Sequence, residues 1–237
     1  MVDTGERFES GERYPLQIPG LPYVLHLPWV WLPGDEQDVR IASLNLIGQV
    51  RWNADLGALL ADRVRSAVPD LRDVCLMTVV EKSLQMAQVT ASALGVVEMA
   101  VAYNRVKPHM EPFDRPVIQV GADSITSGVK YLALYERDIN LLSARAAAGV
   151  ILIDDVVTTG GTVLGLVELL HQVARFRSLP RPIPLLGVFC VAEEGRRSRL
   201  LPAPVHALGR LPDPQVRPGT LRQNGRQETL WPRPRSG

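Results

Sequence analysis

One segment of the sequence, residues 149–162, carries the residue types best suited to chemistry. It reads GVILIDDVVTTGGT, so that a short apolar run leads to two aspartates and then to a turn rich in threonine and glycine. A helix-period pattern begins directly afterwards, at Val163. Glycines allow a positive φ and a close approach of the backbone to a ligand, and the first N–H groups of a helix favour an anion. We therefore predict a phosphate-binding loop formed by Thr158, Thr159, Gly160, Gly161 and Thr162.

Asp154 and Asp155 stand just before this loop. Carboxylates only accept hydrogen bonds, so two of them beside a phosphate are expected to bind sugar hydroxyls or a cation. A ribose 5-phosphate satisfies both demands. The segment differs from a Walker loop, which has a lysine after its last glycine, and from a dinucleotide fingerprint, which lacks the acidic pair.

The elements that must position these residues follow from the apolar pattern. Four runs, at 74–80, 96–103, 150–153 and 185–192, are short, rich in β-branched residues and too continuous for strands with one buried face. Helix-period segments, at 56–68, 86–94 and 163–176, alternate with them. The alternation predicts an α/β fold with a doubly wound, mostly parallel sheet. Ligands of such sheets bind at the carboxyl ends of the strands, where the strand order reverses.

The chain divides into three predicted parts. Residues 1–40 form a Pro-rich N-terminal arm, extended or in edge strands without a helix, because proline fixes φ and removes a donor. Residues 41–212 form the core. Residues 213–237 contain few core-forming side chains and many Pro, Gly, Arg and Gln, which predicts a disordered tail.

Composition excludes several classes of function. Twenty-six Lys and Arg balance 25 Asp and Glu, for a formal net charge of +1, so a general nucleic-acid-binding surface is not expected. No apolar run approaches the ~20 residues that span a bilayer, and the N-terminus lacks a secretory pattern. Cys75 and Cys190 lie far apart in apolar stretches, as core residues of a reducing compartment do. We therefore expect a cytoplasmic protein without membrane contact.

The apolar run, the acidic pair and the Thr-Thr-Gly-Gly-Thr turn together resemble the phosphoribosyl-pyrophosphate (PRPP) signature of the type I phosphoribosyltransferases. The resemblance covers residues 14–212 and is greatest to the adenine/xanthine (purine) branch. It implies a transferase, dimeric in its relatives, that moves the ribose 5-phosphate of PRPP to a purine base and releases pyrophosphate. Asp154 and Asp155 would hold the ribose hydroxyls, the 158–162 loop would hold the 5-phosphate, and Mg²⁺ would be bound through PRPP without a direct protein ligand. A mobile hairpin at about 110–134 would cover the site.

The same resemblance assigns a pyrophosphate site to two further segments. The residues expected to bind there are Glu81, Lys82 and Ser83 after the first strand, and Arg105 and Lys107 after the second. Lys82 and Lys107 would stabilise the leaving group and so act with the two aspartates in catalysis. Relatives carry glycine at the position of Ser83, and often an Arg-Lys pair where this chain has Tyr103 and Asn104. We expect serine to resist a strained backbone that glycine accepts.

These departures keep an alternative open, a non-catalytic PRPP-binding regulator of the purine-repressor kind. The altered pyrophosphate loop favours it, whereas the absence of a helix-turn-helix pattern in the first 40 residues disfavours it. The role of Glu193 and Glu194, at the end of the last core strand, is also open between contact with the base and capping of the next turn.

Overall fold

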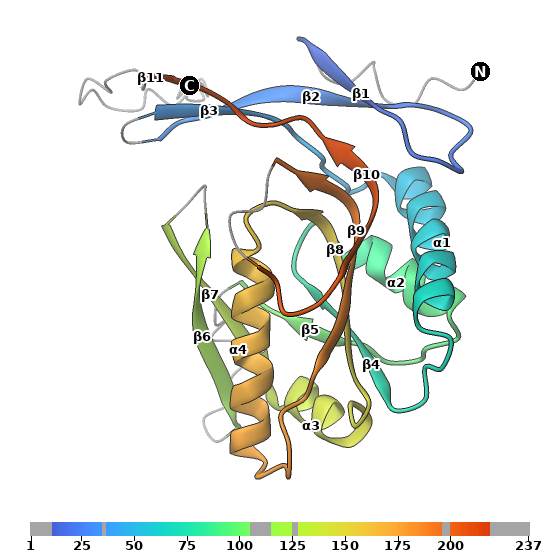
Figure 1. Cartoon of the computed structure of the whole chain (residues 1–237), viewed down its shortest axis with the longest axis vertical. Coiled ribbons are helices and arrows are strands. Elements are labelled where there is room, and N and C mark those ends of the chain that lie inside the picture. Colours follow the sequence, from blue (N-terminus) through green and yellow to red (C-terminus); the bar gives the residue numbers. More distant parts are fainter. Residues whose placement is uncertain (1–10, 35–36, 105–114, 125–127, 196–199, 219–237) are drawn as a thin grey trace, which may run out of the picture.

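A parallel sheet forms the centre of the molecule. The structure, a computed structural model, describes residues 11–34, 37–104, 115–124, 128–195 and 200–218. In this part of the chain five parallel strands have the order β10-β9-β8-β4-β5 (Figure 1). Their bounds are Val74–Val79 for β4, Ala100–Ala102 for β5, Gly149–Val157 for β8, Leu185–Glu194 for β9 and Val205–Leu211 for β10. The predicted α/β fold with a mostly parallel sheet is confirmed.

The strand order reverses in the middle of this sheet. From β4 the chain continues to β5 at one edge, whereas from β8 it continues through β9 to β10 at the other edge. Strands β4 and β8 are hydrogen-bonded neighbours, with Thr78 opposite Ile153. The carboxyl ends of β4 and β8 therefore border the crevice in which ligands of doubly wound sheets bind.

Helices cover both faces of the sheet. The described residues form four of them: α1 (Val50–Ala67), α2 (Leu84–Ala93), α3 (Glu136–Arg145) and α4 (Gly161–Phe176). Along β8, Ile151 and Ile153 pack in one buried cluster with α1 and α2, while Val150 and Leu152 pack in another with α3 and α4. Both faces of β8 are therefore buried, which explains why its sequence is a continuous apolar run. α1 begins six residues before the predicted helix.

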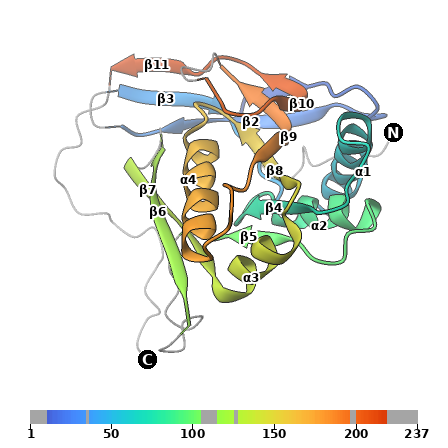
Figure 2. The same ribbon diagram turned by 60° about the horizontal axis from the view of Figure 1, so that its bottom comes forward.

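A second, antiparallel sheet lies across one end of the central sheet (Figures 1 and 2). Its order is β1-β2-β3-β11, with bounds Arg13–Leu16, Leu25–Leu32, Gln37–Ala42 and Gln215–Pro218. The segment predicted as a Pro-rich arm thus supplies β1, β2 and most of β3. Strand β11 falls within the predicted tail, so the ordered chain extends beyond the boundary at residue 213 because β11 pairs with β3. Residues 219–237 lie outside the described residues.

The remaining strands form an antiparallel pair beside α4 (Figure 1). They are β6 (Val117–Ser124) and β7 (Gly128–Tyr135), and Tyr103 joins β7 through two main-chain hydrogen bonds of 2.8 Å with Ala133. The pair overlaps the hairpin predicted at about 110–134, whose movement over the site stays a prediction. No helix of the described chain is long and apolar enough to span a membrane.

Candidate functional site

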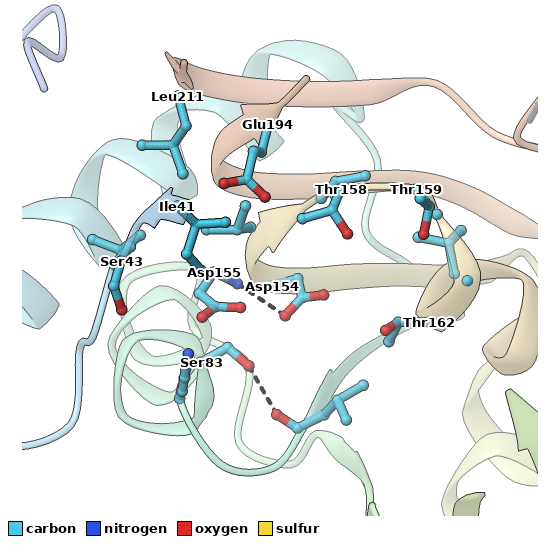
Figure 3. A pocket seen from close by; sticks show the side chains of 18 of the residues that line it. Ile41, Ser43, Ser83, Asp154, Asp155, Thr158, Thr159, Thr162, Glu194 and Leu211 are labelled. Carbon is cyan, nitrogen blue, oxygen red and sulfur yellow. Dashed lines mark hydrogen bonds between the residues drawn. The ribbon is translucent and has the colours of Figure 1, made fainter. Parts of the chain in front are cut away.

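A cavity of about 520 Å³ opens where the strand order reverses. Its lining comes from the turn after β4, from the end of β8 through the start of α4, from the antiparallel sheet, and from the ends of β9 and β10 (Figure 3). Most of the residues predicted from the sequence for PRPP and pyrophosphate line it together: Glu81, Lys82, Ser83, Asp154, Asp155, Thr158, Thr159, Gly160, Gly161 and Thr162. Arg105 and Lys107, predicted for pyrophosphate, lie outside the described residues.

The loop between β8 and α4 has the geometry of an anion site. Gly160, at the N-cap of α4, has φ of 84°, and a Cβ at this position would come within 2.5 Å of Cδ2 of Leu201. No side chain caps α4, and its first turn contains no acidic residue. The N–H groups of this turn therefore face the cavity without a side-chain partner, and the helix dipole adds positive potential.

The acidic pair lies at the centre of the cavity. Asp154 is only 8% exposed, and its Oδ1 accepts a 2.9 Å hydrogen bond from the main-chain N–H of Asp155 (Figure 3). Burial, and next the charge of Asp155, raise the pKa of Asp154 well above the ordinary value, although this hydrogen bond and the nearby Ser83 hydroxyl act in the opposite direction. A buried carboxyl of this kind is best satisfied by hydroxyl donors of a ligand.

The turn after β4 contributes a cation to the cavity lining. Lys82 is exposed to the cavity, and the Val80–Glu81 peptide bond before it is cis. Ser83 is buried, its Oγ donates to the carbonyl of Val79 at 2.8 Å, and it lies 3.0 Å from Oγ1 of Thr78. Its φ of −85° is ordinary helical backbone, so the strain expected for serine at this position does not arise. The serine hydroxyl instead holds the turn against β4.

The second departure from the family pattern has a similarly local explanation. Tyr103 packs edge-on against Tyr135, with ring centroids 5.0 Å apart and an interplanar angle of 77°. Asn104, the next residue, lines the cavity. The aromatic residue at this position therefore anchors the chain between β5 and β7, and the amide of Asn104 supplies a neutral hydrogen-bonding group to the cavity wall.

Sequence reasoning did not assign Glu194 to the site, although it named this residue as a possible base contact. Glu194 ends β9 opposite Leu211 of β10 and is 7% exposed. Among the described residues nothing hydrogen-bonds to its buried Oε1. Burial raises the pKa of Glu194 to about 7, against the opposing charge of Lys82. The only sequence signal was an acidic residue at the carboxyl end of a buried parallel strand.

Comparison with solved structures identifies the fold. An adenine phosphoribosyltransferase from Rhodothermus marinus is 14% identical, with 83% of this chain and 94% of that chain covered and a TM-score of 0.53. The enzyme from Giardia lamblia complexed with 9-deazaadenine is 17% identical, with 70% and 81% covered and a TM-score of 0.43. The enzyme from Trypanosoma brucei, in complex with AMP, pyrophosphate and ribose-5-phosphate, is 15% identical, with 78% and 76% covered and a TM-score of 0.43.

The likeness to the Rhodothermus structure shows that the chain has the fold of the type I phosphoribosyltransferases, in the form found in the adenine enzymes. The resemblance predicted from the Asp-Asp and Thr-Thr-Gly-Gly-Thr segment is confirmed at this level. No protein-family model matches the chain, and no curated protein sequence matches it.

Proposed function

We propose that the protein is a purine phosphoribosyltransferase that transfers the ribose 5-phosphate of PRPP to a purine base and releases pyrophosphate. The observation that carries this proposal is the meeting of the Asp154–Asp155 pair and the uncapped 158–162 loop in one cavity at the reversal of strand order. The pair suits a vicinal diol and the loop suits a phosphate monoester, and a ribose 5-phosphate presents both groups at a fixed separation.

In the reaction, the bond between ribose C1 and a pyrophosphate oxygen breaks, a ring nitrogen of the base bonds to C1, and that nitrogen releases its proton. Charge develops positively at the sugar and negatively on the leaving group. The two aspartates and the 158–162 loop hold the sugar in place, and Lys82, which lines the same cavity, stabilises the departing pyrophosphate. Arg105 and Lys107 are proposed to add charge to the same group. Closure of the hairpin over the cavity would exclude water.

Mg²⁺ is part of the proposal. No group of three or more His, Cys, Asp or Glu in the described chain is arranged to hold a metal ion. Mg²⁺ would therefore be held by oxygens of PRPP, the hard ligands that it prefers, without a direct protein ligand. When bound, the ion neutralises charge on the pyrophosphate. Asp154 and Asp155 would orient the sugar hydroxyls. Action as a homodimer rests on the resemblance, and a cytoplasmic location rests on the N-terminal pattern and the two cysteines.

The test is incubation of labelled PRPP and Mg²⁺ with adenine, guanine, hypoxanthine, xanthine or uracil, followed by separation of nucleotide and pyrophosphate. We expect one or more purine nucleotides to form. Asp155→Asn should abolish the reaction, whereas Asp62→Asn, on the surface of α1, should leave it unchanged. PRPP binding without turnover would reject the enzyme and favour the PRPP-binding regulator. Absence of PRPP binding would contradict both.

A further inference from the structure

The cavity has a second, apolar half that the ribose 5-phosphate leaves unexplained. The antiparallel sheet and the end of β10 contribute its walls, which are Leu32, Val39, Ile41, Leu211, Pro214 and Val216. Glu194 lines the cavity together with these apolar residues, and Figure 3 shows its side chain between Leu211 and Thr158, above Ile41. A flat heterocycle, apolar on its faces and polar along its edge, fits apolar walls with one polar group.

Glu194 has no structural task that accounts for its burial. Its Oε1 makes no hydrogen bond within the described chain. The carbonyl of Gly195, which follows it, accepts a hydrogen bond of 3.1 Å from Arg210, so the start of the next turn is held by Arg210. An unpaired buried carboxyl costs about 1–3 kcal/mol or more, and such groups cluster at binding sites, where a ligand supplies the partner. The capping role left open by the sequence therefore has no support.

The chemistry of a carboxyl group restricts the ligand edge that it can pair with. The ionised form only accepts hydrogen bonds, and the neutral form offers a single donor beside an acceptor. The ionised form therefore needs an N–H on the ligand, whereas the neutral form can also donate its O–H to a ligand acceptor. An exocyclic amino group meets this need, as it does when a carboxylate accepts from the amino group of a base in nucleic-acid recognition. Hypoxanthine, xanthine and uracil can donate only from a ring N–H, and the carbonyl oxygen beside it would face the carboxylate as a second acceptor.

We propose that Glu194 selects the base by accepting a hydrogen bond from an exocyclic amino group, so that aminopurines, adenine or guanine, bind in preference to hypoxanthine, xanthine and uracil. This inference rests on the proposed function, because the ribose and phosphate contacts must first bring the base to the apolar half. The pKa of Glu194, raised to about 7, leaves both protonation states available near neutral pH.

Equilibrium binding of nucleoside 5′-monophosphates tests the inference without requiring turnover. Calorimetry with Mg²⁺ would compare AMP, GMP, IMP, XMP, UMP and ribose 5-phosphate. The proteins would be wild type, Glu194→Gln and Glu194→Leu, with Glu193→Gln as the matched control. Glu193 is the adjacent glutamate of β9, and it is not part of the cavity lining.

We expect wild type to bind AMP or GMP at least about 10-fold more tightly than the other nucleotides, and Glu194→Leu to remove this preference. Glu194→Gln, whose amide both donates and accepts hydrogen bonds, should reduce the preference for AMP or GMP and bind IMP more tightly than wild type does. Ribose 5-phosphate should bind equally to all four proteins, which also reports that each variant is folded.

Two results would overturn the role of Glu194 alone: an unchanged nucleotide preference in Glu194→Leu, or wild-type binding of IMP and XMP as tight as that of AMP and GMP. Failure of wild type to bind ribose 5-phosphate and every monophosphate would instead reject the proposed function, and the role of Glu194 with it.

Discussion

The main-chain N–H of Asp155 donates a hydrogen bond to Oδ1 of Asp154, at 2.9 Å, near the carboxyl end of strand β8, just before the 158–162 loop. This bond fixes the orientation of a carboxyl group that is almost fully buried and lies beside a second carboxylate. The pair is therefore oriented for a ligand before one binds. This arrangement lowers the stability of the ligand-free protein, since burial and repulsion by Asp155 both disfavour the charge on Asp154.

Asp154→Asn should stabilise the folded protein and weaken PRPP binding. Asparagine keeps the Oδ1 acceptor and removes the charge, so we expect about 1 kcal/mol of added stability at pH 8 and PRPP binding weakened by roughly 100-fold. The folded pKa of Asp154 is raised, so its ionisation lowers stability as pH rises. The gain should therefore vanish below about pH 4, where the unfolded chain also retains the proton.

Thermal unfolding across pH and calorimetry with PRPP would measure the two effects of Asp154→Asn. The control is Asp62→Asn, at an exposed ion pair with Arg65, which should change neither quantity. A variant less stable than wild type at pH 8 would show that Asp154 has a structural role that outweighs its burial.

Gly160→Ala should weaken PRPP binding by disturbing the loop before α4. The left-handed φ of 84° costs an L-residue about 1 kcal/mol, and the new Cβ would displace Leu201. We expect a stability loss of roughly 1–2 kcal/mol and a PRPP affinity lowered about 10-fold. Chemical denaturation and calorimetry measure these effects.

Gly95→Ala separates the backbone cost from the loss of site geometry. Gly95 follows α2 with φ of +72°, and an added Cβ there meets no atom within 4 Å. It should lose about 1 kcal/mol of stability without any change in PRPP affinity. Equal effects of both substitutions on binding would mean that Gly160 acts only through general stability.

The features formed by residues that are close in the sequence could be predicted. The 149–162 segment contains strand, acidic pair and loop as consecutive residues, so their proximity requires no tertiary information. The strand was recognisable because Ile151 and Leu152 face opposite buried clusters, which leaves no polar alternation. α3 was missed, because of its side chains only four are buried and most of the others are polar.

Pairings between distant segments could not be predicted. Strand β11 joins β3 across most of the chain, and Arg217 donates to the buried Asp38 at 3.1 Å, in a segment whose composition resembles a disordered tail. The position of Glu194 among Ile41 and Leu211 likewise arises only when three separate strands converge. Sequence patterns report local burial, whereas these relationships depend on non-local strand pairing.

Lys82→Arg should lower turnover more than PRPP binding. A compact ammonium can follow the charge on a departing phosphate, whereas the planar guanidinium is larger and has a fixed fork of donors. We expect kcat to fall about 10-fold and the Kd of PRPP to change by less than about 3-fold, with a larger loss of kcat in Lys82→Met. Steady-state kinetics and calorimetry supply the two constants.

The converse exchange, Arg72→Lys at an exposed pair with Asp70, is the control for Lys82→Arg and should leave both constants unchanged. Parallel losses in kcat/KM and PRPP affinity, with kcat intact, would show that Lys82 acts equally on bound substrate and transition state.

Glu194 should make the stability of the free protein depend on pH in a window set by its two pKa values. Burial raises the pKa of Glu194 from 4.5 to about 7, so the folded state holds its proton more tightly than the unfolded state does. The contribution of the protonated Glu194 carboxyl to the free energy of unfolding is fully present below about pH 4.5 and is lost as the pH rises to about 7. Because Gln cannot ionise, Glu194→Gln should lack this decline.

The difference in unfolding free energy between Glu194→Gln and wild type should consequently grow in favour of the variant by up to about 3 kcal/mol between pH 4.5 and pH 8. Urea denaturation at closely spaced pH values measures it, and subtraction of the two curves removes the contributions of Asp154 and other shared groups. Parallel curves would mean that Glu194 ionises in the folded protein as it does in the unfolded chain. A saturating aminopurine nucleotide that pairs with the ionised carboxylate should move the wild-type window to lower pH, because it stabilises the charged form.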